Sequence, residues 1–148
     1  HALEARLSAL GDTRCLSEIN EAGRDPATLH YIIVDSFGLL AALYRKGTIA
    51  YIGGGLGAGI HNLNEAAAYG IPVVFGPRHE KFKEAADLIK AGGGFDFDDA
   101  AAFDTVMTRL VADKELRRRA GAAAGKYIAD SIGATDRIFN DIFQPSSK

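Results

Sequence analysis

Between residues 30 and 98, the chain alternates short apolar segments rich in β-branched residues with longer segments of helical pattern. The expected strands are 30–34, 48–53, 71–76 and 94–98. The expected helices between them are 36–47, 61–70 and 80–93. A strand followed by a helix and then by another strand needs a crossover connection, which is how parallel strands are joined. The sequence therefore predicts an α/β fold with a doubly wound, Rossmann-like parallel sheet.

The two ends of the chain are expected to be helical. Residues 1–10 repeat leucine at helical spacing. Residues 101–113 keep an apolar stripe at the same spacing, and residues 114–133 gather small side chains on one face, which predicts a helical C-terminal tail. A length of 148 residues fits a single domain, 1–148. Because the chain begins at His1 without a Met, we interpret it as an N-terminally truncated fragment.

Composition argues against several classes of function. The formal net charge of −2 gives no general electrostatic reason to bind nucleic acid, and we expect no such partner. Cys15 is the only cysteine, so the chain has no internal disulfide and suggests no cysteine-based metal site. No apolar run reaches about 18 residues and no signal-peptide pattern is present, so we expect a soluble fragment.

Five glycines gather where the second expected strand ends and a helix is about to begin. They are Gly53, Gly54, Gly55, Gly57 and Gly59. In open α/β sheets this is the place where ligands bind. Glycine permits positive φ angles and has no Cβ to keep a phosphate away from the backbone amides. The cluster therefore predicts a loop that binds a phosphate-bearing ligand.

The glycine cluster also has other interpretations. Residues 53–58 formally satisfy G-x-G-x-x-G/A, but the dinucleotide-binding motif wants an acidic residue at the end of the next strand, where this chain has Phe75 and Gly76. A P-loop is excluded because no Gly-Lys-Ser/Thr follows the cluster. A glycine-rich turn that only packs tightly stays open as the structural alternative.

His61, Asn62 and Glu65 favour a binding site over a packing turn. On a helix that begins near residue 61, Glu65 lies one turn after His61, so both side chains project from one face. A carboxylate there can accept hydrogen bonds from a ribose diol, while His61 and Asn62 face phosphate and sugar oxygens. Taken singly, His61 could be a cap or packing residue and Glu65 a solvated acid of the first helical turn.

The segment "GGGLGAGIHNLNEAAAYGIPVVFGPRHEKFKEAADLI" resembles the nucleotide-binding signature of the 3-deoxy-D-manno-oct-2-ulosonic acid (Kdo) transferases. "VDSFGLLAALYRKGTIAYIGGG" resembles the family's upstream D-[ST]-x-G-x-L-x-x-L-Y element, and "GAT" at 133–135 resembles its C-terminal Gly-Ala. The resemblance keeps order and spacing across residues 31–140. These enzymes transfer Kdo from CMP-Kdo to the lipid A precursor in lipopolysaccharide synthesis.

Three positions depart from the family's pattern. The family often has Ser at the place of Gly55, Pro at the place of Ala66 and Asn at the place of Lys81. These changes put hydroxyl or amide contacts at residues 55 and 81 in doubt. They leave the backbone of the glycine loop and the pair Asn62 and Glu65 intact.

The resemblance implies a glycosyltransferase of the GT-B type, with this chain as its donor-binding C-terminal half. Such an enzyme inverts the anomeric centre without a metal and without a cofactor, using CMP-Kdo as donor substrate. The catalytic base, the membrane anchor and the surface for the lipid A precursor are then expected in an N-terminal domain, at the cytoplasmic face of the inner membrane. We accordingly assign no catalytic residue here.

The expected strand 30–34 suggests self-association. If its neighbouring strands are absent, the strand has an exposed edge, so we expect a homo-oligomer.

The family's binding residues carry over by motif. Ser36, Gly38 and Leu39 are implied to form one edge of the cytidine or phosphate pocket. The glycine loop and His61, Asn62 and Glu65 are implied to bind phosphate, sugar and ribose. Gly76, Pro77 and Arg78 would line the same crevice, with the Arg78 guanidinium on the sugar carboxylate. A solvated loop arginine is the alternative for Arg78, and His79 is expected at the loop surface.

Two alternatives of other kinds stay open. One is another GT-B enzyme that acts on a nucleotide sugar, such as a UDP-GlcNAc-dependent transferase or epimerase. The other is a nucleotide-binding module without catalysis. Both share the glycine loop and the later glutamate, whereas "GIHN" before Glu65 together with "DSFGLLAALY" at 35–44 favours Kdo transfer.

Overall fold

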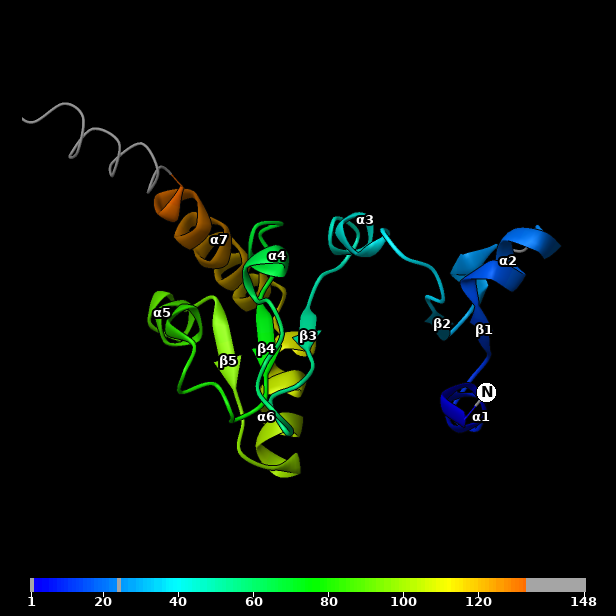
Figure 1. Cartoon of the computed structure of the whole chain (residues 1–148), viewed down its shortest axis with the longest axis horizontal. Coiled ribbons are helices and arrows are strands. Elements are labelled where there is room, and N and C mark those ends of the chain that lie inside the picture. Colours follow the sequence, from blue (N-terminus) through cyan, green and yellow to red (C-terminus); the bar gives the residue numbers. More distant parts are fainter. Residues whose placement is uncertain (1, 24, 133–148) are drawn as a thin grey trace, which may run out of the picture. The chain divides into compact units, whose positions relative to one another are not determined.

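The structure is a computed structural model that describes residues 2–23 and 25–132 (Figure 1). The chain divides into two compact units, residues 1–40 and 41–148, which are described separately. The prediction of a single domain over 1–148 stays a prediction. The family-like Gly-Ala element at 133–135 lies outside the described residues.

The first unit is built on two parallel strands. The elements are α1 (Ala2–Ser8), β1 (Thr13–Cys15), α2 (Leu16–Ala22), a 3₁₀ turn at Pro26–Thr28 and β2 (Tyr31–Ile33). Thr13 pairs with Tyr31 and Cys15 with Ile33. Ile19 and Thr13 are buried, and the Thr13 hydroxyl donates a hydrogen bond to the Gly11 carbonyl at 2.9 Å. The expected strand 30–34 is confirmed as β2, and its neighbour β1 is a strand that the sequence analysis missed.

The second unit carries a three-stranded parallel sheet with the order β3-β4-β5. Figure 1 shows β4 between its two neighbours. The elements are α3 (Leu40–Tyr44), β3 (Ala50–Ile52), α4 (Asn64–Ala67), β4 (Val73–Phe75), α5 (Lys83–Ala91), β5 (Gly94–Asp96), α6 (Ala100–Ala112) and α7 (Lys114–Ser131). The sequence predicted one sheet of four strands, whereas the strands form two sheets, because β2 pairs with β1.

Helices cover both faces of the three-stranded sheet. Val73 and Phe75 of β4 join one buried cluster with residues of α4, α5 and α7, including Ala67, Leu88 and Ala124. Val74, whose side chain points the other way, joins a second cluster with Leu110 of α6. The doubly wound fold is therefore confirmed, with a core on each side of β4. The predicted helical tail is confirmed by α6 and α7.

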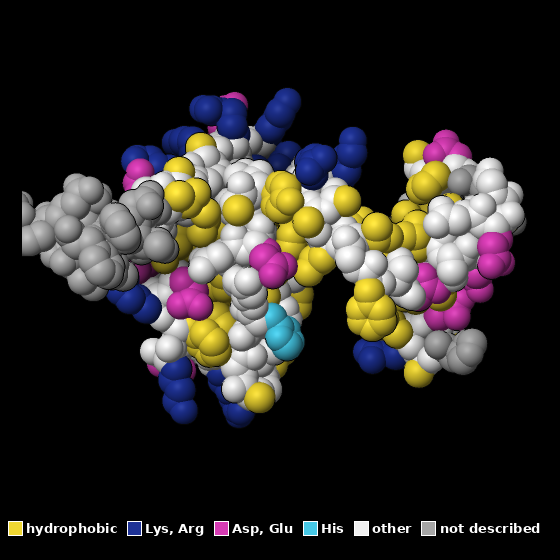
Figure 2. Space-filling model, turned by 45° about the horizontal axis from the view of Figure 1, so that its top comes forward, with side chains coloured by type: hydrophobic (Ala, Val, Ile, Leu, Met, Phe, Trp, Pro, Cys, Tyr) yellow, Lys and Arg dark blue, Asp and Glu magenta, His cyan; other side chains and the backbone are white. Residues whose placement is uncertain are grey.

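Most of the helices start later or end earlier than the sequence pattern predicts. The pattern gave 36–47, 61–70 and 80–93, and the structure gives Leu40–Tyr44, Asn64–Ala67 and Lys83–Ala91. Within the described part of the chain, no helix is both long and apolar enough to cross a membrane. Figure 2 shows hydrophobic side chains at the surface of both units, and the exposed ones include Phe37 in the first unit and Tyr51 and Leu56 in the second.

Candidate functional site

The glycine loop follows directly from the carboxyl end of β3. Backbone hydrogen bonds close the loop. The amides of Gly57 and Gly59 donate to the Gly54 carbonyl, at 2.8 and 3.3 Å, and the His61 amide donates to the Gly53 carbonyl at 3.1 Å. Gly54 and Gly59 have φ angles of 94° and 133°, a region that side chains disfavour. The expected positive φ angles are therefore present at two of the five glycines.

Gly55 is needed because two backbone segments meet there. A Cβ atom on Gly55 would lie 2.7 Å from the Cα of Gly76, the residue that follows β4. The Gly55 carbonyl also accepts a hydrogen bond from the Arg78 amide at 3.0 Å. The structure thus brings the predicted site residues Gly55, Gly76 and Arg78 together, and the loop rests on the end of β4.

Arg78 holds the loop with its side chain as well. Its Nη1 donates a hydrogen bond to the Gly57 carbonyl at 2.6 Å. Beside this contact lies a pocket of about 260 Å³, formed by residues 57–59 of the loop and by Arg78, Glu80, Lys81 and Phe82. The Arg78 guanidinium therefore braces the loop, while its assignment to a sugar carboxylate stays a prediction.

Asn62 and Glu65 form a pair next to the loop. The Asn62 Nδ2 donates to the Glu65 Oε1 at 3.1 Å, and the Asn62 Oδ1 accepts from the Asn64 amide at 3.0 Å. The Glu65 carboxylate is exposed. The pKa of the Tyr44 hydroxyl is raised, first because Tyr44 is partly buried and second because the Glu65 charge is near. Tyr44 is thus a neighbour of Glu65 that the site prediction did not include.

The predicted helical relation between His61 and Glu65 is wrong. α4 begins at Asn64, so His61 precedes the helix and is exposed. The physical reason is the Asn62 side chain, whose Oδ1 accepts a hydrogen bond from the Asn64 amide and so competes with a helix that starts earlier. His61 instead lies against the start of the loop, where its Cδ2 would be 3.3 Å from a Cβ atom on Gly54.

Ser36, Gly38 and Leu39 lie in the first unit, whereas the glycine loop lies in the second. Gly38 has a φ of 82°, which explains the glycine at this turn. A Cβ atom on Gly38 would meet nothing within 4 Å among the described residues. The role of these three residues in a nucleotide pocket shared with the glycine loop stays a prediction.

His79 is a residue that the sequence analysis misjudged. It was expected at the loop surface, but its side chain is only 16% exposed. Its Nε2 lies 3.0 Å from the Asp96 Oδ2, and its ring meets Phe75 edge to face with centroids 5.2 Å apart. The segment between β4 and α5, which carries Arg78, is thereby fastened to the end of β5. Sequence spacing gave no signal for a pairing 17 residues apart.

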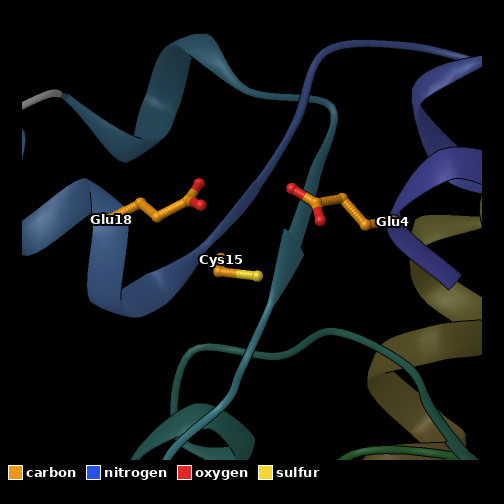
Figure 3. A group of neighbouring side chains, drawn as sticks. All are labelled: Glu4, Cys15 and Glu18. Carbon is orange, nitrogen blue, oxygen red and sulfur yellow. The ribbon is translucent and has the colours of Figure 1, made fainter. Parts of the chain in front are cut away.

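One group of potential metal ligands lies in the first unit. Glu4, Cys15 and Glu18 place their ligand atoms within 4.8 Å of one another, the one such trio that residues 2–23 and 25–132 contain (Figure 3). Burial, and next the charge of Glu4, raise the pKa of the Cys15 thiol. A protonated thiol is a poor metal ligand. The trio is not among the glycine-loop residues, and a reaction without a metal stays a prediction.

Known proteins resemble this chain over most of the described region. No family model matches it. It is 38% identical over 86 residues to a 3-deoxy-D-manno-octulosonic acid transferase of Aquifex aeolicus, covering 57% of this chain and 24% of that protein. The enzyme of the same name in Bordetella pertussis is 32% identical over 121 residues, covering 80% and 28%. The chain thus spans about a quarter of the length of the curated relatives it matches.

A solved structure has the same fold. It is described as the crystal structure of the C-terminal CMP-Kdo binding domain of WaaA from Acinetobacter baumannii. The superposition has a TM-score of 0.68 and covers 82% of this chain and 63% of that one, with 23% of residues identical. At this identity the likeness supports the fold and carries no residue-level assignment.

Proposed function

The chain is related to the 3-deoxy-D-manno-octulosonic acid transferases and corresponds to their C-terminal domain, and on this premise we propose that it binds the CMP-Kdo donor. The complete enzyme would be a glycosyltransferase, and this chain would form its donor-binding part. The glycine loop and the pair Asn62 and Glu65 would form the nucleotide site.

The observation that carries this proposal is a run of unused amides in the glycine loop. The backbone N–H groups of Gly54, Gly55 and Leu56 donate to no group within the described ranges. Backbone amides that lack an internal acceptor need another oxygen, from water or from a ligand. Consecutive amides in a turn form a concave anion site, which suits the phosphate of a nucleotide. In transfer, the same amides would stabilise the departing CMP.

Glu65 supplies the part of the site that would recognise the sugar of the nucleotide. Its carboxylate is exposed and is held by Asn62 at Oε1. A carboxylate oriented in this way can accept hydrogen bonds from both hydroxyls of a ribose. We therefore place the ribose at Glu65 and the phosphate at residues 54–56.

The reaction of the whole enzyme is part of the proposal. It would transfer Kdo to the lipid A precursor with inversion, within a GT-B architecture at the inner membrane, using a carboxylate base. The base and the acceptor surface would belong to the three quarters of the relatives' length that this chain does not match. On this proposal, residues 1–148 alone bind the donor and transfer no Kdo.

A thermal-shift comparison tests the proposal against its alternatives. CMP, UDP, GDP and NAD are each added to the chain, and a ligand that binds the folded state raises the melting temperature by mass action. The proposal expects the largest rise with CMP. A larger rise with UDP would favour a UDP-sugar enzyme, and a rise with NAD alone would favour the dinucleotide interpretation of residues 53–58.

A further inference from the structure

The pocket beside the glycine loop contains more positive than negative charge. Of its lining side chains, Arg78 and Lys81 are cationic and Glu80 is anionic. Residues 57–59 of the loop line the same pocket. A small pocket with one excess positive charge next to a phosphate-binding loop suits an anionic group of the ligand.

Arg78 and Lys81 differ in their contacts. The Arg78 Nη1 donates to the Gly57 carbonyl at 2.6 Å, so this nitrogen already has a partner in the loop. Lys81 is exposed, and its ammonium has no acceptor within residues 2–23 and 25–132. Two residues later, Lys83 shows the contrast, because its Nζ donates to Asp87 at 2.5 Å.

The backbone that carries Lys81 is held in place. The Phe82 amide donates to the His79 carbonyl at 2.8 Å, which closes a turn around Lys81. The Phe82 ring lies against the loop, since a Cβ atom on Gly59 would be 3.1 Å from its Cε2. His79 itself is fastened to Asp96. Lys81 therefore starts from a fixed point at the pocket wall, and only its flexible side chain has to be ordered by a ligand.

We infer that Lys81 binds an anionic oxygen group of the donor, either the nucleotide phosphate or the carboxylate of the transferred sugar, while Arg78 positions the loop. This inference rests on the proposed donor site. The two cations of the pocket then have different roles. Arg78 shapes the backbone that receives the ligand, and Lys81 pairs with the negative charge of the ligand. An ammonium suits this task because it is a compact charge on a flexible stem.

The test is a calorimetric titration of the full chain with cytidine, CMP and CMP-Kdo at low and moderate salt. The variants are Lys81→Met, which keeps the stem and removes the charge, and Lys81→Arg, which keeps the charge. Lys83→Met is the matched control, since its ammonium is paired with Asp87. Thermal unfolding of each variant verifies that the fold is unchanged.

If Lys81 meets the phosphate, Lys81→Met binds CMP about three- to tenfold more weakly, with cytidine unchanged and a smaller salt dependence. If it meets the carboxylate, CMP is unchanged and CMP-Kdo weakens by that factor. Lys81→Arg keeps most of the affinity in both cases. Equal affinities of Lys81→Met and the unaltered chain for all three ligands would overturn the inference and leave the donor site standing. Failure of the unaltered chain to bind CMP or CMP-Kdo would overturn the proposed function as well.

Discussion

Gly55 and Gly76 approach each other so closely that a Cβ atom on Gly55 would lie 2.7 Å from the Gly76 Cα. Gly55 is in the glycine loop after β3, and Gly76 follows β4, so the segments that leave two neighbouring strands meet through backbone atoms alone. The contact fixes the loop relative to β4 and to Arg78, whose amide donates to the Gly55 carbonyl. The site thus depends on the absence of a side chain at residue 55.

Gly55→Ala should therefore lower the free energy of unfolding by about 1–3 kcal/mol, the range for overpacking a tight contact. CMP affinity should fall as well, because the loop has to move away from β4. Gly57→Ala is the control for stability, since its Cβ would lie 3.6 Å from the Gly54 carbonyl oxygen, an ordinary contact. Urea unfolding and CMP titration measure both effects. Equal stability of the two variants would show that the loop does not rest on β4 in this way.

Glu65→Gln should weaken CMP binding by about 1–3 kcal/mol, the cost of losing a hydrogen bond to a charged group. Stability should change little because Glu65 is exposed. Glu84→Gln is the matched control: Glu84 is also an acid in the first turn of a helix, but in α5. Calorimetric titration of both variants with CMP decides the point. An unchanged dissociation constant for Glu65→Gln would return Glu65 to the role of a solvated first-turn acid.

Gly121→Ala should destabilise the second unit. A Cβ atom there would lie 2.1 Å from the Gly70 carbonyl oxygen, so α7 would have to move away from the turn before β4. We expect a loss of about 1–3 kcal/mol. Gly125→Ala, one turn later, would place its Cβ at an ordinary 3.4 Å from the Gly70 Cα and should also gain helix propensity. Chemical unfolding in which Gly121→Ala is as stable as Gly125→Ala would contradict this packing.

Asp35 is expected to make the first unit sensitive to acid. The Ser17 hydroxyl donates to its Oδ2 at 2.5 Å and the Ser17 amide to its Oδ1 at 3.1 Å, and these bonds lower the pKa of the Asp35 carboxyl in the folded state. A carboxyl whose folded pKa is depressed stabilises the fold above its unfolded pKa of about 3.9 and loses this contribution as the pH falls through the folded value.

Hydrogen exchange of the amides in α2 should therefore accelerate as the pH falls from 6 to 3, once the intrinsic pH dependence of exchange is removed. Asp35→Asn should flatten this change because the side chain no longer titrates. Asp104→Asn, which removes an exposed carboxylate of α6 that makes no hydrogen bond to the described residues, is the control. A pH response of Asp35→Asn equal to that of the unaltered chain would mean that this pair does not govern the acid sensitivity of α2.

The sequence predicted the second unit well because its signals are local. Val73, Val74 and Phe75 form an apolar strand, and the helical patterns on either side specify a crossover, so a doubly wound sheet follows. β1 was missed because Thr13–Cys15 is three residues long and shows no apolar alternation. A strand of this kind is defined by its partner β2 and not by its own pattern.

The site was predicted in part, and its errors share one cause. The loop glycines follow from their position after a strand, but their reasons differ: Gly54 and Gly59 need positive φ, whereas Gly55 needs contact with Gly76. The Asn62 side chain delays the helix to Asn64, which no periodicity reveals. His79 pairs with Asp96 only because two strand ends meet. These features depend on contacts of particular side chains and backbone segments. The periodicity of the sequence carries no information about such contacts.

We propose that the glycine loop binds the nucleotide of the donor, and NMR mapping of CMP onto the ¹⁵N-labelled full chain tests this binding most directly. We expect saturable shifts in the amides of residues 53–59, 62–65, 76 and 78–82, with a dissociation constant of about a millimolar because one domain alone lacks cleft closure. UMP and GMP should produce smaller shifts at the same concentration. Shifts that cluster away from these residues, or no shifts at CMP concentrations well above millimolar, would contradict a nucleotide site at the glycine loop.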